Sequence, residues 1–366
     1  MDAIPTVGVE EEFLLTDPGT GAPTAKNTQV ADAAKSAGID LQLELTRCQV
    51  ETSTGVHSDI AALLAELRTL RRTVAACAAH NDARLLAVAV PPTVPDRFPV
   101  TDTPRYQRIA HTYGRIAHEQ GLCGCHVHVA IPDRETALRV SNHVRPWLPV
   151  YLAMTANSAI YRGSETGYAS WRSILWRRWP SAGPPPYFSS LTEYDALVEM
   201  LRASGSILDN KMLYWDIRPS ETFPTIEIRV SDVAATPDEA ALLAAMIRGA
   251  VTMGLRANAR GESAPAVPAE VLYAAYWNAA HLGLDGDGLD PIARRVAPHR
   301  VLLTELIHHI EPALRDSGDH AFVTDAVAAL HERGNGAQRQ IRAMRLRREV
   351  DDVVAELARA TLEGCA

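Results

Sequence analysis

Several segments of this chain alternate apolar and polar residues with a period of two, and this pattern indicates a fold that contains a sheet with one apolar face. The first is GVEEEFLL (8–15), in which Glu10 and Glu12 share one strand face while Glu11 lies on the apolar face. A charged strand face is most often a solvated face of a sheet. One such pair alone therefore indicates no function, and Glu11 is interpreted as a structural residue for which a buried ion pair is an option.

The pattern recurs in LQLELTRCQVETSTG (41–55), which carries Glu44 and Glu51. Their separation of seven is odd, so one unbroken strand would point the two carboxylates to opposite faces. We therefore expect a bulge or a turn near residues 46–48, because such a break can bring both side chains to the same side.

The segment CGCHVHVAI (123–131) places His126 and His128 on one strand face and the thiols of Cys123 and Cys125 on the other. Four tetrahedral zinc ligands cannot come from such a stretch, so both cysteines are interpreted as small core residues. The two histidines could be ligands of a different metal or ordinary core histidines, and this segment alone leaves both alternatives open.

A fourth segment, TIEIRVSD (225–232), places Glu227 and Arg229 on one face. If the polar faces of the four segments meet, their carboxylates repel one another and are driven toward protonation unless divalent cations neutralise them. Oxygen ligands with few thiols favour magnesium or manganese over zinc, and magnesium together with arginines is the apparatus of phosphoryl transfer. The chain has neither a Walker A loop nor a Rossmann glycine motif, so another fold must hold ATP if ATP binds.

The distribution of these patterns indicates an α+β protein with an antiparallel sheet, because strands lie in the first two thirds of the chain and helices dominate the last third. We expect one catalytic domain over residues 1–366, with a sheet-bearing core (1–235) and a helical part (236–366) packed on it. Residues 161–190 have no clear period, which is more typical of a functional loop than of a spacer. Strands are expected at 7–15, 41–52, 84–90, 123–131, 212–217 and 225–230. Helices are expected after a cap at Ser58 or Asp59, with apolar positions recurring from Leu63 to Val74, at 103–119, and from 133 and 237 onward.

The amino-acid composition limits which kinds of binding partner and which cellular compartment we expect. With 47% hydrophobic and 22% charged residues the chain is globular, and its net charge of −8 gives no general attraction to nucleic acid or to an anionic membrane. No apolar stretch is expected to approach the length of a membrane span, because even the most apolar helical segment, 147–160, is too short. Five cysteines without a framework spacing, and no secretory signal before Gly8, predict a reduced protein in the cytoplasm.

Taken in order, the four segments together with YASWRSILWRRWPSAGPP (168–185) and WDIRPS (215–220) resemble the carboxylate–amine ligase family, also called type 2 glutamate–cysteine ligases. The resemblance runs from Gly8 to Asp232, with a weaker echo at GNGAQRQ (334–340). It implies a glutamine synthetase-like catalytic fold, in which a curved antiparallel sheet flanked by helices forms a funnel that holds ATP and two or three magnesium ions, with manganese as a substitute.

The resemblance also implies roles for individual residues, carried over by position. The residues expected to hold one metal are Glu12, Glu44 and Glu51, and those expected to hold the nucleotide-linked metal are Glu10, His126 and Glu227. The residues expected near the nucleotide or the transferred phosphate are His128 and Arg229. The candidates for binding phosphate or the acid substrate are Arg172, Arg177, Arg178 and Arg218. The alternative interpretation is that they are surface arginines of a loop, packed against Trp171, Trp176 and Trp179.

The implied activity is ATP-dependent amide formation. A carboxylate attacks the γ-phosphate of ATP to give an acyl phosphate, and an amine then displaces phosphate. Glutamate and cysteine are the family's default acid and amine. The alternatives are a ligase of the same mechanism that uses another acid or amine, a guanidino phosphotransferase, and a relative that only binds nucleotide. The expected partners are small-molecule substrates, with no nucleic acid and no membrane, and a homo-oligomer is left open by analogy.

Overall fold

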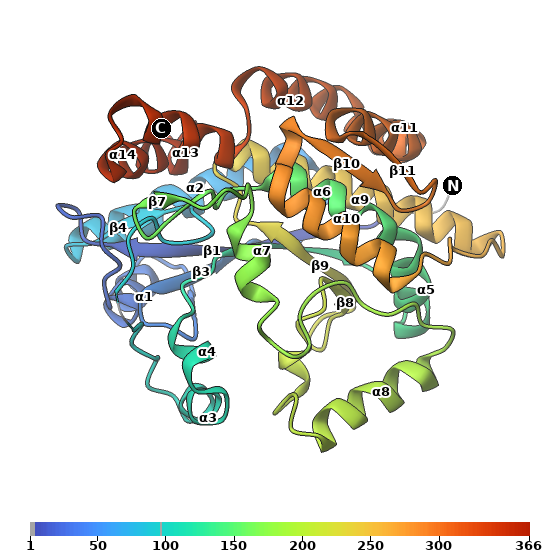
Figure 1. The fold of residues 1–366 in the computed structure, drawn as a ribbon, viewed down its shortest axis with the longest axis horizontal. Helices are drawn as coiled ribbons and strands as arrows, with labels where there is room; N and C mark the ends of the chain where they lie inside the picture. Colours follow the sequence, from blue (N-terminus) through green and yellow to red (C-terminus); the bar gives the residue numbers. More distant parts are fainter. Residues whose placement is uncertain (1–3, 96) are drawn as a thin grey trace.

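The computed structural model describes residues 4–95 and 97–366 and has an antiparallel sheet at its centre (Figure 1). The sheet has the strand order β2-β3-β1-β5-β9-β8, and β4 also pairs with β1. Its strands are β1 (Val7–Thr16), β2 (Gln42–Leu43), β3 (Gln49–Ser53), β4 (Arg84–Leu86), β5 (Gly124–Ala130), β8 (Ile217–Pro219) and β9 (Thr225–Asp232). The α+β architecture with an antiparallel sheet is therefore confirmed.

The helices lie on both sides of this sheet (Figure 1). On one side α6, α9, α10, α11 and α12 form a layer, and on the other α3, α4 and α8 stand apart and flank the space beneath the sheet. The helices are α1 (Asn27–Ser36), α2 (Ile60–His80), α3 (Pro104–Tyr113), α4 (Arg115–His118), α5 (Arg134–Val144), α6 (Leu148–Thr155), α7 (Trp171–Trp176), α8 (Leu191–Ala203), α9 (Pro237–Ala259), α10 (Ala269–Leu282), α11 (His299–Ser317), α12 (His320–Arg333), α13 (Gly336–Arg347) and α14 (Val350–Thr361).

The alternation of β1 separates a core face from a polar face. Val7 and Val9 are buried in the core that also contains Leu63 and Leu67 of α2. Glu11 shares this buried face, and its carboxylate accepts hydrogen bonds from Arg71 Nη2 at 2.5 Å and Nε at 3.1 Å. The buried ion pair considered for Glu11 is thus present. Glu10 and Glu12 point to the opposite, more open face of the sheet.

The expected break in segment 41–55 is a turn that divides it into two paired strands. β2 and β3 are antiparallel, with Gln42 opposite Glu51, and the chain turns at residues 47–48 between them. Asp59 caps α2 by accepting a hydrogen bond from the Ala62 amide at 3.0 Å, which confirms one of the two caps predicted for that helix.

Some predicted elements are wrong in extent. The expected helix 103–119 is divided at Gly114, whose φ of +54° is unfavourable for most other residues, and so forms α3 and α4. The expected strand 84–90 ends at Leu86, because the next amide, Ala87, bonds the Thr361 hydroxyl of α14 at 2.9 Å instead of a strand. The expected strand 212–217 is mostly a 3-10 turn (Asn210–Met212) and a loop, and β8 begins only at Ile217.

Two regions contain more regular structure than their sequence patterns predict. Residues 161–190 contain all but the first residue of a small hairpin, β6 (Ile160–Tyr161) with β7 (Ser164–Glu165), and they also contain α7. The helical C-terminal part contains a second hairpin, β10 (Asp287–Asp290) with β11 (Arg295–Pro298). Both hairpins are too short for alternation to show in the sequence.

The longest helix, α9, packs against β1, β5 and α2 in the centre of the molecule. Of the helices in the described ranges, it alone has the length and apolar composition that a membrane span requires, and 83% of its apolar window is buried inside the fold. The expectation that no apolar stretch reaches that length is therefore wrong for α9. Its burial is the reason for its composition, because a helix surrounded by protein is apolar on all sides.

Candidate functional site

The polar face of the sheet forms the floor of a cavity of about 480 Å³. Side chains from β1, β2, β3, β5, β8 and β9 line it, together with residues of α3, the last residue of α7 (Trp176), Trp179, and the segments 120–122 and 211–223. All six predicted metal ligands line this cavity, as do His128, Arg218 and Arg229. The polar faces of the four alternating segments therefore do meet in the structure, which the sequence left as a condition.

Strand register explains how the acids come together. β1 lies between β3 and β5, with Glu12 opposite Glu51 and Glu10 opposite His126. On the other side of β5, Glu227 of β9 lies opposite His128. Residues that are opposite one another on the same face of a sheet have neighbouring side chains. Three strand pairings therefore place residues that are far apart in the chain within reach of shared ions.

The ligating atoms gather in three overlapping sets, in each of which they lie within 4.8 Å of one another. The sets are Glu12, Glu44 and Glu51; Glu10, Glu51 and His126; and Glu10, His128 and Glu227. The first set has the same members as one predicted metal site. The second predicted site, Glu10 with His126 and Glu227, is divided between the other two sets, and His128, predicted to lie near the nucleotide, takes the place of His126 beside Glu227.

The carboxylates differ in their electrostatic surroundings. Burial, reinforced by the neighbouring charge of Glu12, raises the pKa of Glu44 to about 8. Burial and the charges of Glu44, Glu10 and Glu12 likewise hold the pKa of Glu51 well above its ordinary value. These two acids therefore have little compensating positive charge around them, which is the condition expected of carboxylates whose counter-charge is a bound cation.

Glu10 and Glu227 have their positive partners within the protein. Burial alone would raise the pKa of Glu10, but hydrogen bonds and charge from His126 and His128 outweigh it and lower the pKa. For Glu227, burial is outweighed by the charges of Arg229 and Arg218, so its pKa lies well below the usual range. Both carboxylates are therefore ionised at neutral pH and available as oxygen ligands.

The histidines also fit a metal site. The Nε2 atoms of His126 and His128 are buried and face carboxylates: His128 Nε2 lies 3.4 Å from Glu10 Oε2, and His126 Nε2 lies 4.0 Å from Glu12 Oε1. Burial and the charge of Arg229 lower the pKa of His126, which favours the neutral imidazole that can bind a metal. Ring nitrogens that face carboxylates inside a cavity are well placed to share a divalent cation with them. The donor set, rich in oxygen and without a thiol, fits magnesium or manganese.

We expect the stability of the metal-free protein to fall as pH rises from about 5 to about 8. The pKa of Glu44 is 4.5 in an unfolded chain and about 8 in the folded one, so in this interval the folded state binds more protons and each rise in pH favours unfolding. The measurement is thermal unfolding in a chelator across this range, repeated with magnesium, which should flatten the dependence. Glu44→Gln should reduce the dependence without magnesium, with Glu51 accounting for the part that is left, whereas a metal-free melting temperature that rises with pH would contradict the assignment.

The predicted arginines divide into two groups. Arg218 and Arg229 line the cavity and both bind Glu227, Arg218 through its Nε at 2.9 Å. Arg229 Nη1 also lies 3.3 Å from His126 Nδ1. These two guanidinium groups are therefore placed beside the proposed metal sets.

The other three arginines belong to α7 or follow it, and none of them lines the cavity as the structure describes it. Arg172 is buried against the ring of Trp176. Arg177 lies over the rings of Tyr273 and Tyr276, and Arg178 pairs with Glu119 at 2.5 Å. Arg172 thus packs on a tryptophan but is buried and not a surface residue, whereas Arg177 packs on tyrosines instead of tryptophans.

Sequence reasoning missed several cavity residues, among them Tyr106, Lys211 and Phe223. The Tyr106 hydroxyl donates to the Leu43 carbonyl at 2.8 Å and so ties α3 to β2. Phe223 is 54% exposed and lies edge-on to His128, with ring centroids 5.9 Å apart. These residues come from a helix and from loops, where no strand alternation could have identified them.

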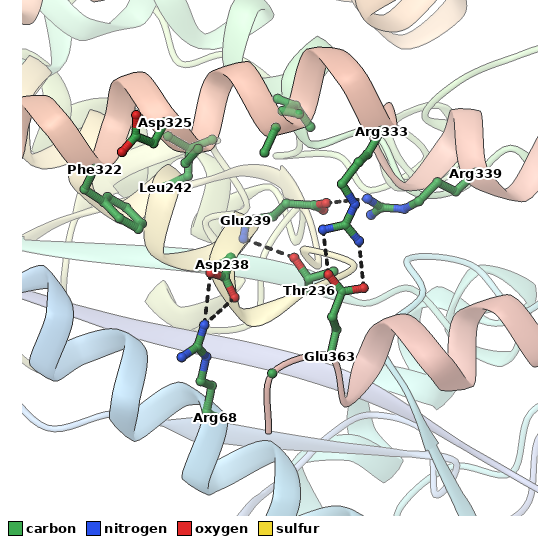
Figure 2. Close-up of a pocket in the computed structure, with 14 residues that line it drawn as sticks. Arg68, Thr236, Asp238, Glu239, Leu242, Phe322, Asp325, Arg333, Arg339 and Glu363 are labelled. Carbon is green, nitrogen blue, oxygen red and sulfur yellow. Dashed lines mark hydrogen bonds and ion pairs between the residues drawn. The ribbon is translucent and has the colours of Figure 1, made fainter. Parts of the chain in front are cut away.

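A second cavity, of about 420 Å³, lies between α2, α9, α12 and the C-terminal residues (Figure 2). Its charged side chains mainly pair with each other: Arg68 with Asp238 at 3.0 Å, Arg333 with Glu363 at 2.6 Å, and Arg339 with Glu239 at 2.6 Å. It contains none of the predicted site residues. We therefore interpret it as a seam of ion pairs that joins the C-terminal helices to the start of α9.

The sequence of this chain is similar to those of glutamate–cysteine ligase homologues along its whole length. A glutamate–cysteine ligase 2-1 homologue from Nocardia farcinica is 67% identical over 366 residues, covering 100% of this chain and 95% of the relative. A glutamate–cysteine ligase 2-2 homologue from Mycolicibacterium vanbaalenii is 57% identical, covering 99% of this chain and 100% of the relative.

Solved structures show the fold in more distant proteins. The glutamate–cysteine ligase of Francisella tularensis, solved in complex with AMP, has a TM-score of 0.70 at 13% identity, over 99% of this chain and 89% of that one. A bifunctional glutathione synthetase from Pasteurella multocida has a TM-score of 0.63, also at 13% identity, over 99% of this chain and 52% of the other. The family model described as glutamate–cysteine ligase family 2 matches residues 6–357. The chain therefore belongs to glutamate–cysteine ligase family 2.

Proposed function

We propose that this protein is an ATP-dependent ligase that joins a carboxylic acid to an amine, with L-glutamate and L-cysteine as the substrates that its relatives' names suggest. The carboxylate takes the γ-phosphoryl group of ATP, which releases ADP and forms an acyl phosphate. The amine nitrogen then attacks the acyl carbon, phosphate leaves, and the amine gives up a proton. The observation that carries this proposal is the presence of three sets of metal-ligating side chains on one sheet face.

The proposed role of the acidic residues is to hold divalent cations at the floor of the cavity. Glu12, Glu44 and Glu51 would hold one ion, and Glu10 with His128 and Glu227 would hold another, while His126 and Glu51 offer a position between them. Bound magnesium would neutralise the phosphate oxygens of ATP and the charge that develops during transfer. The AMP in the F. tularensis structure supports nucleotide use in this fold.

The proposed role of Arg229 and Arg218 is to provide fixed positive charge beside the transferred group. Each is held by Glu227, and Arg229 also contacts His126, so neither side chain has to be ordered at the moment of reaction. Charge that is already oriented stabilises the transition state more effectively than solvent that must reorient. Roles for Arg177 and Arg178 at the nucleotide stay predictions, because in this structure both side chains have other partners.

The proposal is tested with purified protein, ATP and magnesium, incubated with a panel of acids and amines. We expect phosphate release that requires both an acid and an amine, together with a product whose mass is that of the amide, and we expect a chelator to abolish both. Omission of each component in turn is the control. A phosphorylated guanidine would support a phosphotransferase instead, and tight ATP binding without turnover would support a protein that only binds nucleotide.

The cysteines support a reducing compartment, which we propose to be the cytoplasm. All five are buried and have free thiols in the structure. Structural disulfides form and persist in oxidising compartments, and buried free cysteines are ordinary small core residues elsewhere. Cys125 lies in the core beside Val127 and Val129, as its strand face predicts.

A further inference from the structure

Asp232 ends β9 and is fully buried, yet it is not among the residues that line the cavity. Its Oδ2 accepts hydrogen bonds from the Asn157 amide at 2.8 Å and the Ser158 hydroxyl at 2.7 Å, and its Oδ1 accepts one from the Ser170 hydroxyl at 2.9 Å. A carboxylate with three hydrogen bonds at full burial fixes the segments that donate them. Asp232 therefore ties residues 157–158 and the start of α7 to the end of β9.

The same network holds Arg172. The Ser158 hydroxyl accepts a hydrogen bond from the Arg172 amide at 3.1 Å, and Ser170 caps α7 by accepting one from the Ser173 amide. The guanidinium of Arg172 has its Nη1 3.9 Å from Asp232 Oδ1 and is 3% exposed. Arg172 is thus held through its backbone by Ser158 and through its charge by Asp232.

Gly124 is the point at which this arrangement meets the candidate site. Asp232 and Gly124 are paired in the sheet, and the Gly124 amide donates to Glu12 Oε2 at 2.5 Å. A Cβ atom at residue 124 would lie 2.3 Å from Arg172 Nη2 and 3.2 Å from His126 Nε2. The Arg172 guanidinium therefore lies directly against Gly124, on the face that carries His126, at a spacing that only glycine permits.

The C-terminal motif GNGAQRQ completes the network from the other side. Gln340 donates to the Asn157 side-chain oxygen at 2.7 Å and to its carbonyl at 2.8 Å, and accepts from the Ala159 and Ile160 amides. A Cβ at Gly336 would lie 2.1 Å from Asn157 Oδ1, so this helix start also packs closely on Asn157. The motif thus holds the segment that donates to Asp232.

We infer that Asp232 is a positioning residue, which acts through Ser158 and Ser170 to hold the Arg172 guanidinium against Gly124, beside His126 and Glu12. This inference rests on the proposed function. The Arg172 guanidinium would add a fixed positive charge next to His126 and Glu12, two of the proposed metal ligands, and phosphoryl transfer would use such a charge. Asp232 itself touches neither substrate nor metal. Its effect on turnover should therefore depend on Arg172.

The test is a double-mutant cycle on phosphate release. We expect Asp232→Asn to lower kcat by roughly 10- to 100-fold with little change in KM for ATP, because a misplaced charge is lost mainly from the transition state. In an Arg172→Ala background the same substitution should change kcat by less than about twofold, since the group that it positions is absent. Losses that multiply independently in the double variant would overturn the inference.

Matched variants distinguish positioning from general damage. Asp319 is another buried carboxylate that binds an arginine, Arg248, and neither residue lines the cavity. Asp319→Asn should therefore affect stability and have the same effect on kcat in both backgrounds. If Asp232→Asn does not fold, Ser170→Ala keeps the carboxylate and removes two hydrogen bonds, the one to Asp232 and the cap of α7. It should show a smaller loss, of roughly 3- to 10-fold, that also disappears without Arg172.

A crystal structure of the Asp232→Asn variant gives a readout that does not depend on turnover. We expect the Arg172 guanidinium to leave Gly124. A guanidinium that stays in place would overturn the inference, whatever the kinetics. A wild-type protein that releases no phosphate with any acid and amine would contradict the proposed function, and the crystal structure would then still decide the role of Asp232.

Discussion

Replacing Glu12 with glutamine is expected to reduce turnover by at least about 10³-fold, because the substitution removes an anionic ligand from the set that Glu12 forms with Glu44 and Glu51. Folding should persist. A glutamine oxygen can still accept the hydrogen bond that the Gly124 amide donates, and removing one charge lessens the repulsion that raises the pKa of Glu44 and of Glu51.

The measurement is phosphate release at saturating and at limiting magnesium, together with urea unfolding of the same preparations. If Glu12→Gln keeps near-normal turnover at limiting magnesium, the ligand assignment is wrong. Metal titration by calorimetry provides a check without turnover, because the variant should bind magnesium more weakly than the parent protein does.

Replacing the neighbouring Glu11 with glutamine is expected to have the opposite effect: a loss of stability with little loss of turnover. Glu11 is 1% exposed and pairs with Arg71, which is fully buried and also donates to the carbonyls of Ala234, Ala235 and Thr361. Removing one member of a buried ion pair leaves an uncompensated charge and typically costs about 3–5 kcal/mol of the free energy of unfolding. Turnover per folded molecule should stay near that of the parent, because Glu11 lies on the other face of β1.

Urea unfolding measures this loss, and the matched control is Glu12→Gln, one residue away on the same strand. Adding Arg71→Met to Glu11→Gln should restore part of the stability, since the unpaired charge is then removed as well. A Glu11→Gln protein with unchanged stability and lost activity would mean that the two faces of β1 have been assigned the wrong way round.

Glu227 shows where strand alternation alone is a poor guide to a variant's effect. As an expected metal ligand on the polar face of its strand, Glu227 would be expected to tolerate replacement by glutamine with a loss of turnover and little loss of folding, as for Glu12. The structure places Glu227 between Arg218 and Arg229, all three largely buried. Neutralising it would leave two guanidinium groups without their shared partner, so we expect a loss of stability in addition to the loss of turnover.

The parts of the fold and site that could be predicted depend on local periodicity. β1, β5 and β9 each have an apolar face on one side, so their alternation indicated which side chains point to the core and which to the cavity. The odd spacing of Glu44 and Glu51 likewise required the turn that separates β2 from β3. Where no such constraint exists, as in α7, prediction failed.

The arginines and histidines show the limit of the same reasoning. Their residue types and their strand faces are visible in the sequence, but their partners depend on strand register and on loops that are far apart in the chain. His128 therefore joins Glu227 and Glu10, while His126 joins Glu51. Arg172 lies against Gly124 only because Asp232, Ser158 and Ser170 meet at one point.

The alternation of residue types within each strand segment was thus sufficient to identify which residues form an acidic face, since side-chain direction in a strand follows from backbone geometry over a few residues. Which of those residues share an ion, and which arginine stands beside them, was decided by packing between segments up to about two hundred residues apart. Charge interactions weaken with distance and with exposure to water, so the partner of a charged side chain is the group that lies nearest to it in the folded protein. That position depends on the packing of distant segments, which no short stretch of sequence shows.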